Sequence, residues 1–125
     1  MKLKLLVLFG LMLMLSACGE QDTTYDAFAQ CLSDNGATFY GAFYCPHCRD
    51  QKAMFGDSVN LLPYVECYPD GNPDVQSDEC KSHGVKRYPT WIFADGHKEE
   101  GVLSFDELSK YTSCPLPGNE SVMVK

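Results

Sequence analysis

Residues 44–48 read YCPHC, and this stretch decides how the rest of the 125-residue chain is interpreted. Two thiols separated by two residues can bind a metal, form a structural disulfide or exchange electrons with another disulfide. The preceding residues 38–44 (TFYGAFY) are rich in aromatic and small side chains and predict a buried strand. Pro46 suits the first position of a helix. The motif is therefore expected where a strand passes into a helix.

The segments on both sides of the motif alternate between helical and strand patterns. Apolar spacing, a hairpin turn signal and a capping box define their limits. The predicted elements are helices at 24–35, 46–55, 74–83 and 104–112, and strands at 38–44, 64–67, 90–94 and 97–101. A CxxC motif within such an alternation indicates a thioredoxin-like redox site. We therefore predict an α/β protein with a thioredoxin-like fold, in which helices flank a central mixed β-sheet.

The N-terminal segment has the pattern of a secretory signal. Lys2 and Lys4 precede an apolar run at 5–15. That run is too short to cross a bilayer, which takes about 20 residues. Residues 15–18 (LSAC) resemble a bacterial lipobox, which implies that Cys18 is lipidated and becomes the first residue of the mature chain. We therefore expect a lipoprotein that is anchored to a membrane without spanning it.

This interpretation divides the chain into four parts. They are a lipoprotein signal peptide at 1–17, a lipidated tether at 18–23, a thioredoxin-like domain at 24–114 and a loose C-terminal tail at 115–125. The expected location is the extracytoplasmic side of a bacterial cell envelope, which is the periplasmic side in a Gram-negative cell. Loss of the two signal lysines leaves eight basic against seventeen acidic side chains. This balance argues against nucleic acid and anionic lipid as direct partners.

Within the motif, the two cysteines have different expected roles. Cys45 opens a helix, where the helix dipole and unpaired backbone N–H groups stabilise a thiolate, so we expect it to be the exposed nucleophile. Cys48, one turn later, is the expected buried resolving thiol. His47 either stabilises the Cys45 thiolate or is a solvent-exposed imidazole. The Pro46-His47 dipeptide resembles that of DsbA-type oxidants, which implies an oxidising site.

A second stretch, residues 87–91 (RYPTW), is expected to face the motif. Thioredoxin-like folds place a cis-proline opposite the CxxC, and Pro89, immediately before a predicted strand, matches that position. There it would present the backbone of Tyr88 to an extended substrate and keep metals away from the thiols. The alternative is an ordinary trans proline at the start of a strand. Trp91 is expected in the core.

Four segments jointly resemble the thioredoxin domain that is associated with vitamin K epoxide reductase homologues. They are FYGAFYCPHCRDQKAMFG at 39–56, YVECYPDG at 64–71, CKSHGVKRYPTWIF at 80–93 and the strand at Gly101. In that family the domain exchanges disulfides with a quinone-linked membrane reductase, which reoxidises it, and it passes oxidising equivalents to secreted proteins. It is often fused to the membrane enzyme. Here we expect the lipid anchor to substitute for that fusion.

The same resemblance implies a structural disulfide between Cys67 and Cys80. The alternative is a second redox pair that relays electrons to Cys45. Cys31 and Cys114 would then join the first helix to the end of the last, or remain as free buried thiols. An even number of cysteines outside the cytoplasm favours disulfides, but the sequence alone fixes no pairing.

The sequence leaves two other functions open. Thioredoxin keeps a buried aspartate in the strand before its CxxC, and the matching position here is Phe39, which favours an oxidant over a reductase or isomerase. A zinc or copper site is the alternative from a different class. Twelve residues separate Cys67 from Cys80 instead of two, and His83 and His97 are expected at the surface, so the metal site has little support. The oxidoreductase needs no metal or other cofactor.

Overall fold

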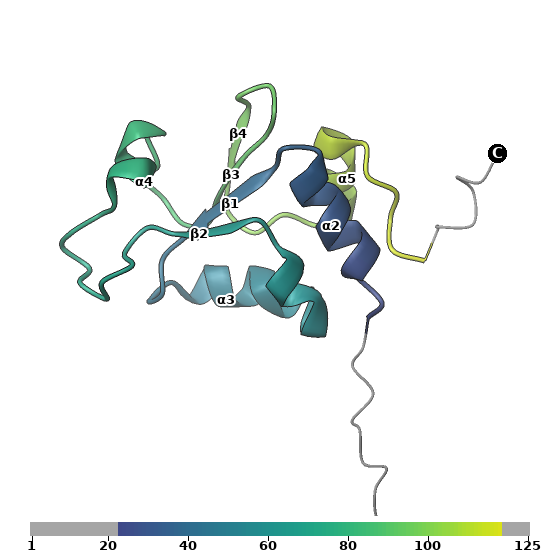
Figure 1. Cartoon of the computed structure of the whole chain (residues 1–125), viewed down its shortest axis with the longest axis horizontal. Helices are drawn as coiled ribbons and strands as arrows, with labels where there is room; N and C mark the ends of the chain where they lie inside the picture. The colour runs from purple at the N-terminus through teal and green to yellow at the C-terminus, as the bar shows by residue number, and fades with distance from the viewer. Residues whose placement is uncertain (1–22, 119–125) are drawn as a thin grey trace, which may run out of the picture.

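The structure is a computed structural model, and it describes residues 23–118. Its elements are α2 (Asp26–Asp34), β1 (Thr38–Gly41), α3 (Pro46–Ala53), the 3-10 helix η1 (Gly56–Leu61), β2 (Tyr64–Glu66), α4 (Asp78–Ser82), β3 (Thr90–Ile92), β4 (Lys98–Glu100) and α5 (Phe105–Thr112). In Figure 1, α3 lies below the sheet, α2 and α5 lie to its right, and α4 lies beyond its left end. The fold is thioredoxin-like α/β, as the sequence predicts.

Strand β1 lies inside a four-stranded mixed sheet with the order β2-β1-β3-β4. It pairs in parallel with β2 and antiparallel with β3, so that Phe39 stands between Tyr64 and Trp91. Side chains alternate between the two faces of a strand. Phe39 accordingly packs in the larger core cluster, and Tyr40 packs in the smaller one beneath α4. Both faces of β1 are therefore covered.

The larger cluster joins α2 to η1 and α5 through aromatic rings. Phe28 lies 6.1 Å from Phe55 and 5.4 Å from Phe105, measured between ring centroids. A disulfide joins Cys31 of α2 to Cys114, which follows α5. Because these cysteines are 83 positions apart in the sequence, closing the loop removes about 4 to 5 kcal/mol of denatured-state entropy in the chain-entropy model.

The amide of Gln51 ties the helix that carries the motif to the rest of the core. Its Oε1 accepts hydrogen bonds from the indole N–H of Trp91 at 3.1 Å and from the backbone N–H of Leu103 at 2.8 Å. Its Nε2 donates to the Leu103 carbonyl at 3.1 Å. Gln51 and Trp91 are both fully buried. The expectation that Trp91 belongs to the core is confirmed.

Two predicted boundaries were wrong. The helix predicted at 74–83 begins only at Asp78, because the Ser77 side chain accepts the backbone N–H of Cys80 and caps it there. The strand predicted at 38–44 ends at Gly41, because the backbone N–H of Cys45 turns back to the carbonyl of Ala42 at 3.0 Å. In both places a local hydrogen bond replaces the continuation of the regular element.

Several expectations fall on residues that the structure does not describe. The signal peptide at 1–17, the lipidation of Cys18, nearly all of the tether and residues 119–125 of the tail lie outside the described part of the chain. Within residues 23–118, no helix is both long enough and apolar enough to cross a membrane.

Candidate active site

The motif stands where β1 turns into α3. Cys45 has extended backbone angles and is the residue immediately before the first turn of α3, while Pro46 occupies the first helical position. Proline fits there because its missing N–H would have no partner inside the helix anyway. Cys45 is therefore placed at the positive end of the helix dipole.

Both motif cysteines are free thiols, and both are largely covered. The side chain of Cys45 is 8% exposed and that of Cys48 is 2% exposed. The prediction of an exposed Cys45 was wrong in this respect. The chain at Tyr88 closes over the thiol, which lies 3.4 Å from the Tyr88 carbonyl oxygen as a hydrogen-bond donor. Cys45 is still the more exposed of the two cysteines. The geometry is therefore compatible with Cys45 as the attacking thiol and Cys48 as the resolving thiol.

Burial raises the pKa of Cys48 to about 12. The hydrogen bond and charge of Cys45 act in the same direction, whereas the Ala42 backbone and the Lys52 ammonium oppose them. The Cys48 thiol therefore keeps its proton at neutral pH. A buried, protonated second thiol becomes nucleophilic only when a nearby group takes that proton.

The other site residues predicted from residues 44–48 and 87–91 are His47, Tyr88 and Pro89. The peptide bond between Tyr88 and Pro89 is cis, and Pro89, the residue immediately before β3, is fully buried. His47 is exposed, and its Nδ1 lies 3.8 Å from a carboxylate oxygen of the equally exposed Asp50. The structure thus brings Tyr88 and Pro89 to Cys45, and it gives His47 the solvent-exposed position that the sequence left as the alternative. A role for His47 at the thiolate stays a prediction.

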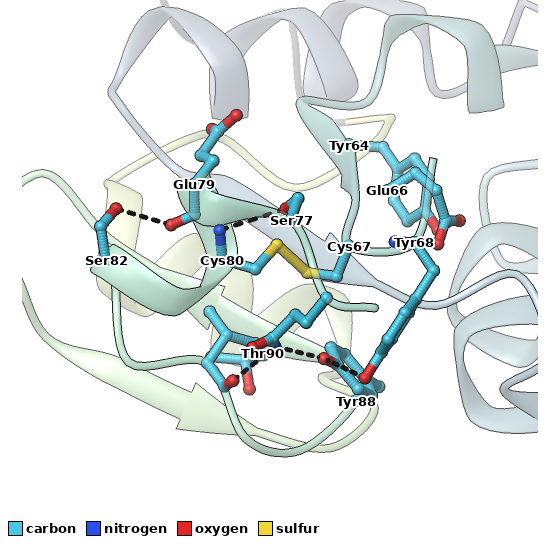
Figure 2. Close-up of a disulfide and its surroundings, with 12 residues drawn as sticks. Tyr64, Glu66, Cys67, Tyr68, Ser77, Glu79, Cys80, Ser82, Tyr88 and Thr90 are labelled. Carbon is cyan, nitrogen blue, oxygen red and sulfur yellow. Dashed lines mark hydrogen bonds between the residues drawn. A yellow bond between two sulfur atoms is a disulfide. The ribbon is translucent and has the colours of Figure 1, made fainter. Parts of the chain in front are cut away.

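Four aromatic side chains lie near the motif, and of these the sequence singled out only Tyr88 as a site residue. Phe43 and Tyr44 are 49% and 44% exposed. The ring of Tyr44 lies 5.4 Å from that of Tyr68, which lies 5.7 Å from that of Tyr88. The Tyr88 hydroxyl donates to the Tyr68 hydroxyl at 3.1 Å, as Figure 2 shows. These four rings form a partly exposed apolar rim beside Cys45.

A polar cluster on β2 was also missed. The Tyr64 hydroxyl donates to Glu66 at 2.6 Å, and the Lys52 ammonium lies 3.4 Å from the centre of the Tyr64 ring. The sequence placed Tyr64 and Glu66 on a strand, where residues two apart share a face. It gave no sign that parallel pairing with β1 would bring that face next to the motif.

The second pair of cysteines forms a disulfide away from the motif. Cys67, just after β2, is bonded to Cys80 of α4 (Figure 2). Both residues are completely buried. A bridge without solvent access suits a structural role better than the alternative of a second redox pair, because labile bridges are strained or exposed.

The disulfides also limit the metal-binding alternative. Cys67 and Cys80 are occupied by each other, and His83 and His97 are exposed. Within residues 23–118, the structure holds no group of three or more histidine, cysteine, aspartate or glutamate side chains that could bind a metal ion. The described part of the chain therefore offers no counterpart to a zinc ribbon.

Fold and site together define a class: a thioredoxin-like domain with a CxxC pair at the start of a helix. No family model matches the chain. The chain is similar to the thiol-disulfide oxidoreductase LTO1 of Arabidopsis thaliana, with 39% identity over 93 residues. The similar region covers 72% of this chain and 24% of that protein. The chain therefore corresponds to about a quarter of the relative's length.

Proposed function

We propose that this protein is a thiol:disulfide oxidoreductase in which Cys45 and Cys48 alternate between dithiol and disulfide. The observation that carries the proposal is the arrangement of the two sulfurs. Cys45 lies at the start of α3 beside the Tyr88 carbonyl, and the more deeply buried Cys48 follows one turn later. The similarity to an enzyme named as a thiol-disulfide oxidoreductase supports the same activity.

The reaction transfers two electrons through a mixed disulfide. A substrate thiolate attacks the Cys45 sulfur of the Cys45–Cys48 disulfide, the bond between the two cysteines breaks, and Cys48 leaves as a thiolate that takes up a proton. The second substrate thiolate then attacks the substrate sulfur of the mixed disulfide and releases Cys45 as a thiolate. The substrate dithiol is oxidised to a disulfide, and the motif is reduced to two thiols.

The proposed direction is oxidation of envelope or secreted proteins. The Pro46-His47 dipeptide resembles that of strong oxidants, and β1 carries an apolar Phe39 where thioredoxin has an aspartate. A quinone-linked membrane protein similar to vitamin K epoxide reductase homologues would reoxidise the motif. The alternatives within the same class are a disulfide reductase and an isomerase.

A trapping experiment tests the proposed chemistry. In a Cys48→Ser variant of the full-length protein, the Cys45 thiolate can still attack a substrate disulfide and expel one substrate sulfur as a thiolate, but no Cys48 thiol is left to resolve the mixed disulfide. We expect disulfide-linked adducts that dithiothreitol releases, seen on non-reducing gels of envelope extracts. The matched Cys45→Ser variant should form few or none. Equal adduct formation by both variants, or none with Cys48→Ser, contradicts the assignment of Cys45 as the attacking residue.

We propose that the protein acts at the outer face of a bacterial membrane and that a lipid on Cys18 anchors it there. The support is the LSAC string at 15–18, which follows a short apolar run. Full-length protein expressed in bacteria that are fed an alkyne-tagged fatty acid should become labelled and sediment with membranes. A Cys18→Ser variant should lose both properties. An unlabelled parent protein in the soluble fraction contradicts the anchor.

A further inference from the structure

The Cys48 thiol needs a group that accepts its proton. Disulfide formation requires Cys48 as a thiolate, because the thiolate is the attacking species, yet burial keeps this thiol protonated at neutral pH. The strand that leads into the motif, β1, has no carboxylate among its four residues, TFYG. Any carboxylate that serves Cys48 therefore comes from another element.

Strand β2 brings a hydroxyl close to the Cys48 sulfur. A β-carbon built on Gly41 would lie 3.0 Å from the Tyr64 Oη and 3.1 Å from the Cys48 Sγ. The two groups thus approach the same point, in space that the missing side chain of Gly41 leaves open. The Tyr64 Oη and the Cys48 Sγ are therefore at most about 6 Å apart, a separation that one water molecule can bridge.

The Tyr64 hydroxyl is already connected to a carboxylate. It donates to Glu66 Oε2 at 2.6 Å, and Figure 2 shows the two residues next to each other. The other oxygen, Oε1, accepts the backbone N–H groups of Phe43 at 3.1 Å and Tyr68 at 3.0 Å. Because Phe43 belongs to the turn that leads into the CxxC, these bonds fix the carboxylate relative to the motif.

Lys52 holds the phenol from the side of α3. Its Nζ lies 3.4 Å from the Tyr64 ring centre, one helical turn beyond Cys48. Burial, together with the bond to Glu66, raises the pKa of Tyr64. The phenol therefore stays neutral. A neutral hydroxyl can accept a proton on one side while it gives up its own on the other.

We propose that Tyr64 and Glu66 form a proton relay for Cys48, an inference that rests on the proposed redox role of the Cys45–Cys48 pair. As Cys48 attacks a mixed disulfide at Cys45, its proton moves to the Tyr64 oxygen and the Tyr64 proton moves to the Glu66 carboxylate. The Cys48 sulfur then bonds to Cys45, and the substrate sulfur leaves as a thiolate. The path runs in reverse when a substrate opens the disulfide.

Titratable groups from several elements face this path. They are Cys45 from the residue before α3, Lys52 from α3, Tyr64 and Glu66 from β2, and Tyr44 and Tyr68 from the neighbouring loops. Among these groups Glu66 is the only carboxylate. It is therefore the group on which the relay ends.

The test separates the two steps of motif oxidation. Reduced full-length protein is mixed with glutathione disulfide, and samples are quenched with acid, alkylated and weighed by mass spectrometry between about pH 6 and about pH 9. Tyr64→Phe keeps the ring over which Lys52 lies, and Glu66→Gln keeps an oxygen for the two backbone N–H groups. We expect each variant to slow the release of glutathione by Cys48 about 100-fold at neutral pH, the lower range of general acid–base catalysis.

Three further readouts distinguish a relay from a loss of structure. As the pH rises, the rates of glutathione release by the variants should approach the parent's rate, because hydroxide then removes the Cys48 proton directly. Formation of the mixed disulfide at Cys45 should keep its rate. The double variant should be no slower than either single variant, because both residues act in one path.

The chain also provides a matched control. Tyr111 of α5 donates to Glu99 of β4 at 2.7 Å, on the opposite edge strand of the sheet. Tyr111→Phe and Glu99→Gln should therefore leave glutathione release unchanged. If Tyr64→Phe and Glu66→Gln release glutathione at the parent's rate and with the parent's pH profile, the relay is overturned. It is also overturned if Tyr111→Phe and Glu99→Gln slow the release equally. A parent protein that forms no Cys45–Cys48 disulfide overturns the proposed function itself.

Discussion

At the scale of single residues, the site depends on buried polar atoms that all have partners. Within residues 23–118, no buried side-chain nitrogen or oxygen lacks a hydrogen bond. Gln51 shows why this matters for function. Its amide joins α3 to Trp91 of β3 and to the backbone at Leu103. It therefore fixes the helix that carries Cys48 against the sheet.

We predict that Gln51→Leu lowers the free energy of unfolding by about 3 kcal/mol, because it leaves the Trp91 indole N–H and the Leu103 N–H and carbonyl buried without partners. Urea unfolding of the protein with its disulfides intact measures the change. The control is Gln30→Leu, since Gln30 is exposed on α2 and bonds only across the helix surface to Asp34. That change should stay within about 0.5 kcal/mol. Equal effects at the two positions would contradict the role given to Gln51.

At the scale of elements, the sequence predicted best where a local signal was complete. The serine and glutamate of the last helix form the expected capping box, with Ser104 accepting the Glu107 N–H and the Glu107 carboxylate accepting the Ser104 N–H. The start of α5 follows from these two residues alone. The CxxC motif likewise predicted the junction of β1 and α3, because Pro46 fits only the first turn of a helix.

Elements that depend on distant residues were harder to predict. Residues 74–77 have a polar, helix-like composition, but the Gln76 side chain donates to the carbonyl of Val85 at 2.7 Å, and the disulfide at Cys80 holds the following turn. Val85 and Cys67 are too distant in sequence to enter a local pattern, and together with the local Ser77 cap they override helical propensity. The position of Tyr64 and Glu66 near Cys48 was not predicted for a similar reason, because it depends on the pairing of β1 with β2.

At the scale of the whole molecule, the fold separates the fixed parts from the reactive part. The disulfide Cys31–Cys114 joins α2 to the end of α5, Cys67–Cys80 joins the end of β2 to α4, and the free thiols Cys45 and Cys48 lie at the start of α3. The motif can therefore change its redox state while the two disulfides hold the framework closed. Disulfide exchange at Cys45 and Cys48 requires this division of roles.

The oxidising role of the Cys45–Cys48 pair is tested by measuring its reduction potential. Full-length protein is equilibrated in glutathione buffers, and alkylation of each cysteine is read by mass spectrometry. We predict a single transition confined to Cys45 and Cys48, with a midpoint close to the about −120 mV of a strong oxidant. A midpoint near the about −270 mV of thioredoxin would contradict the oxidising role. The absence of any transition at these two residues would contradict the redox function as a whole.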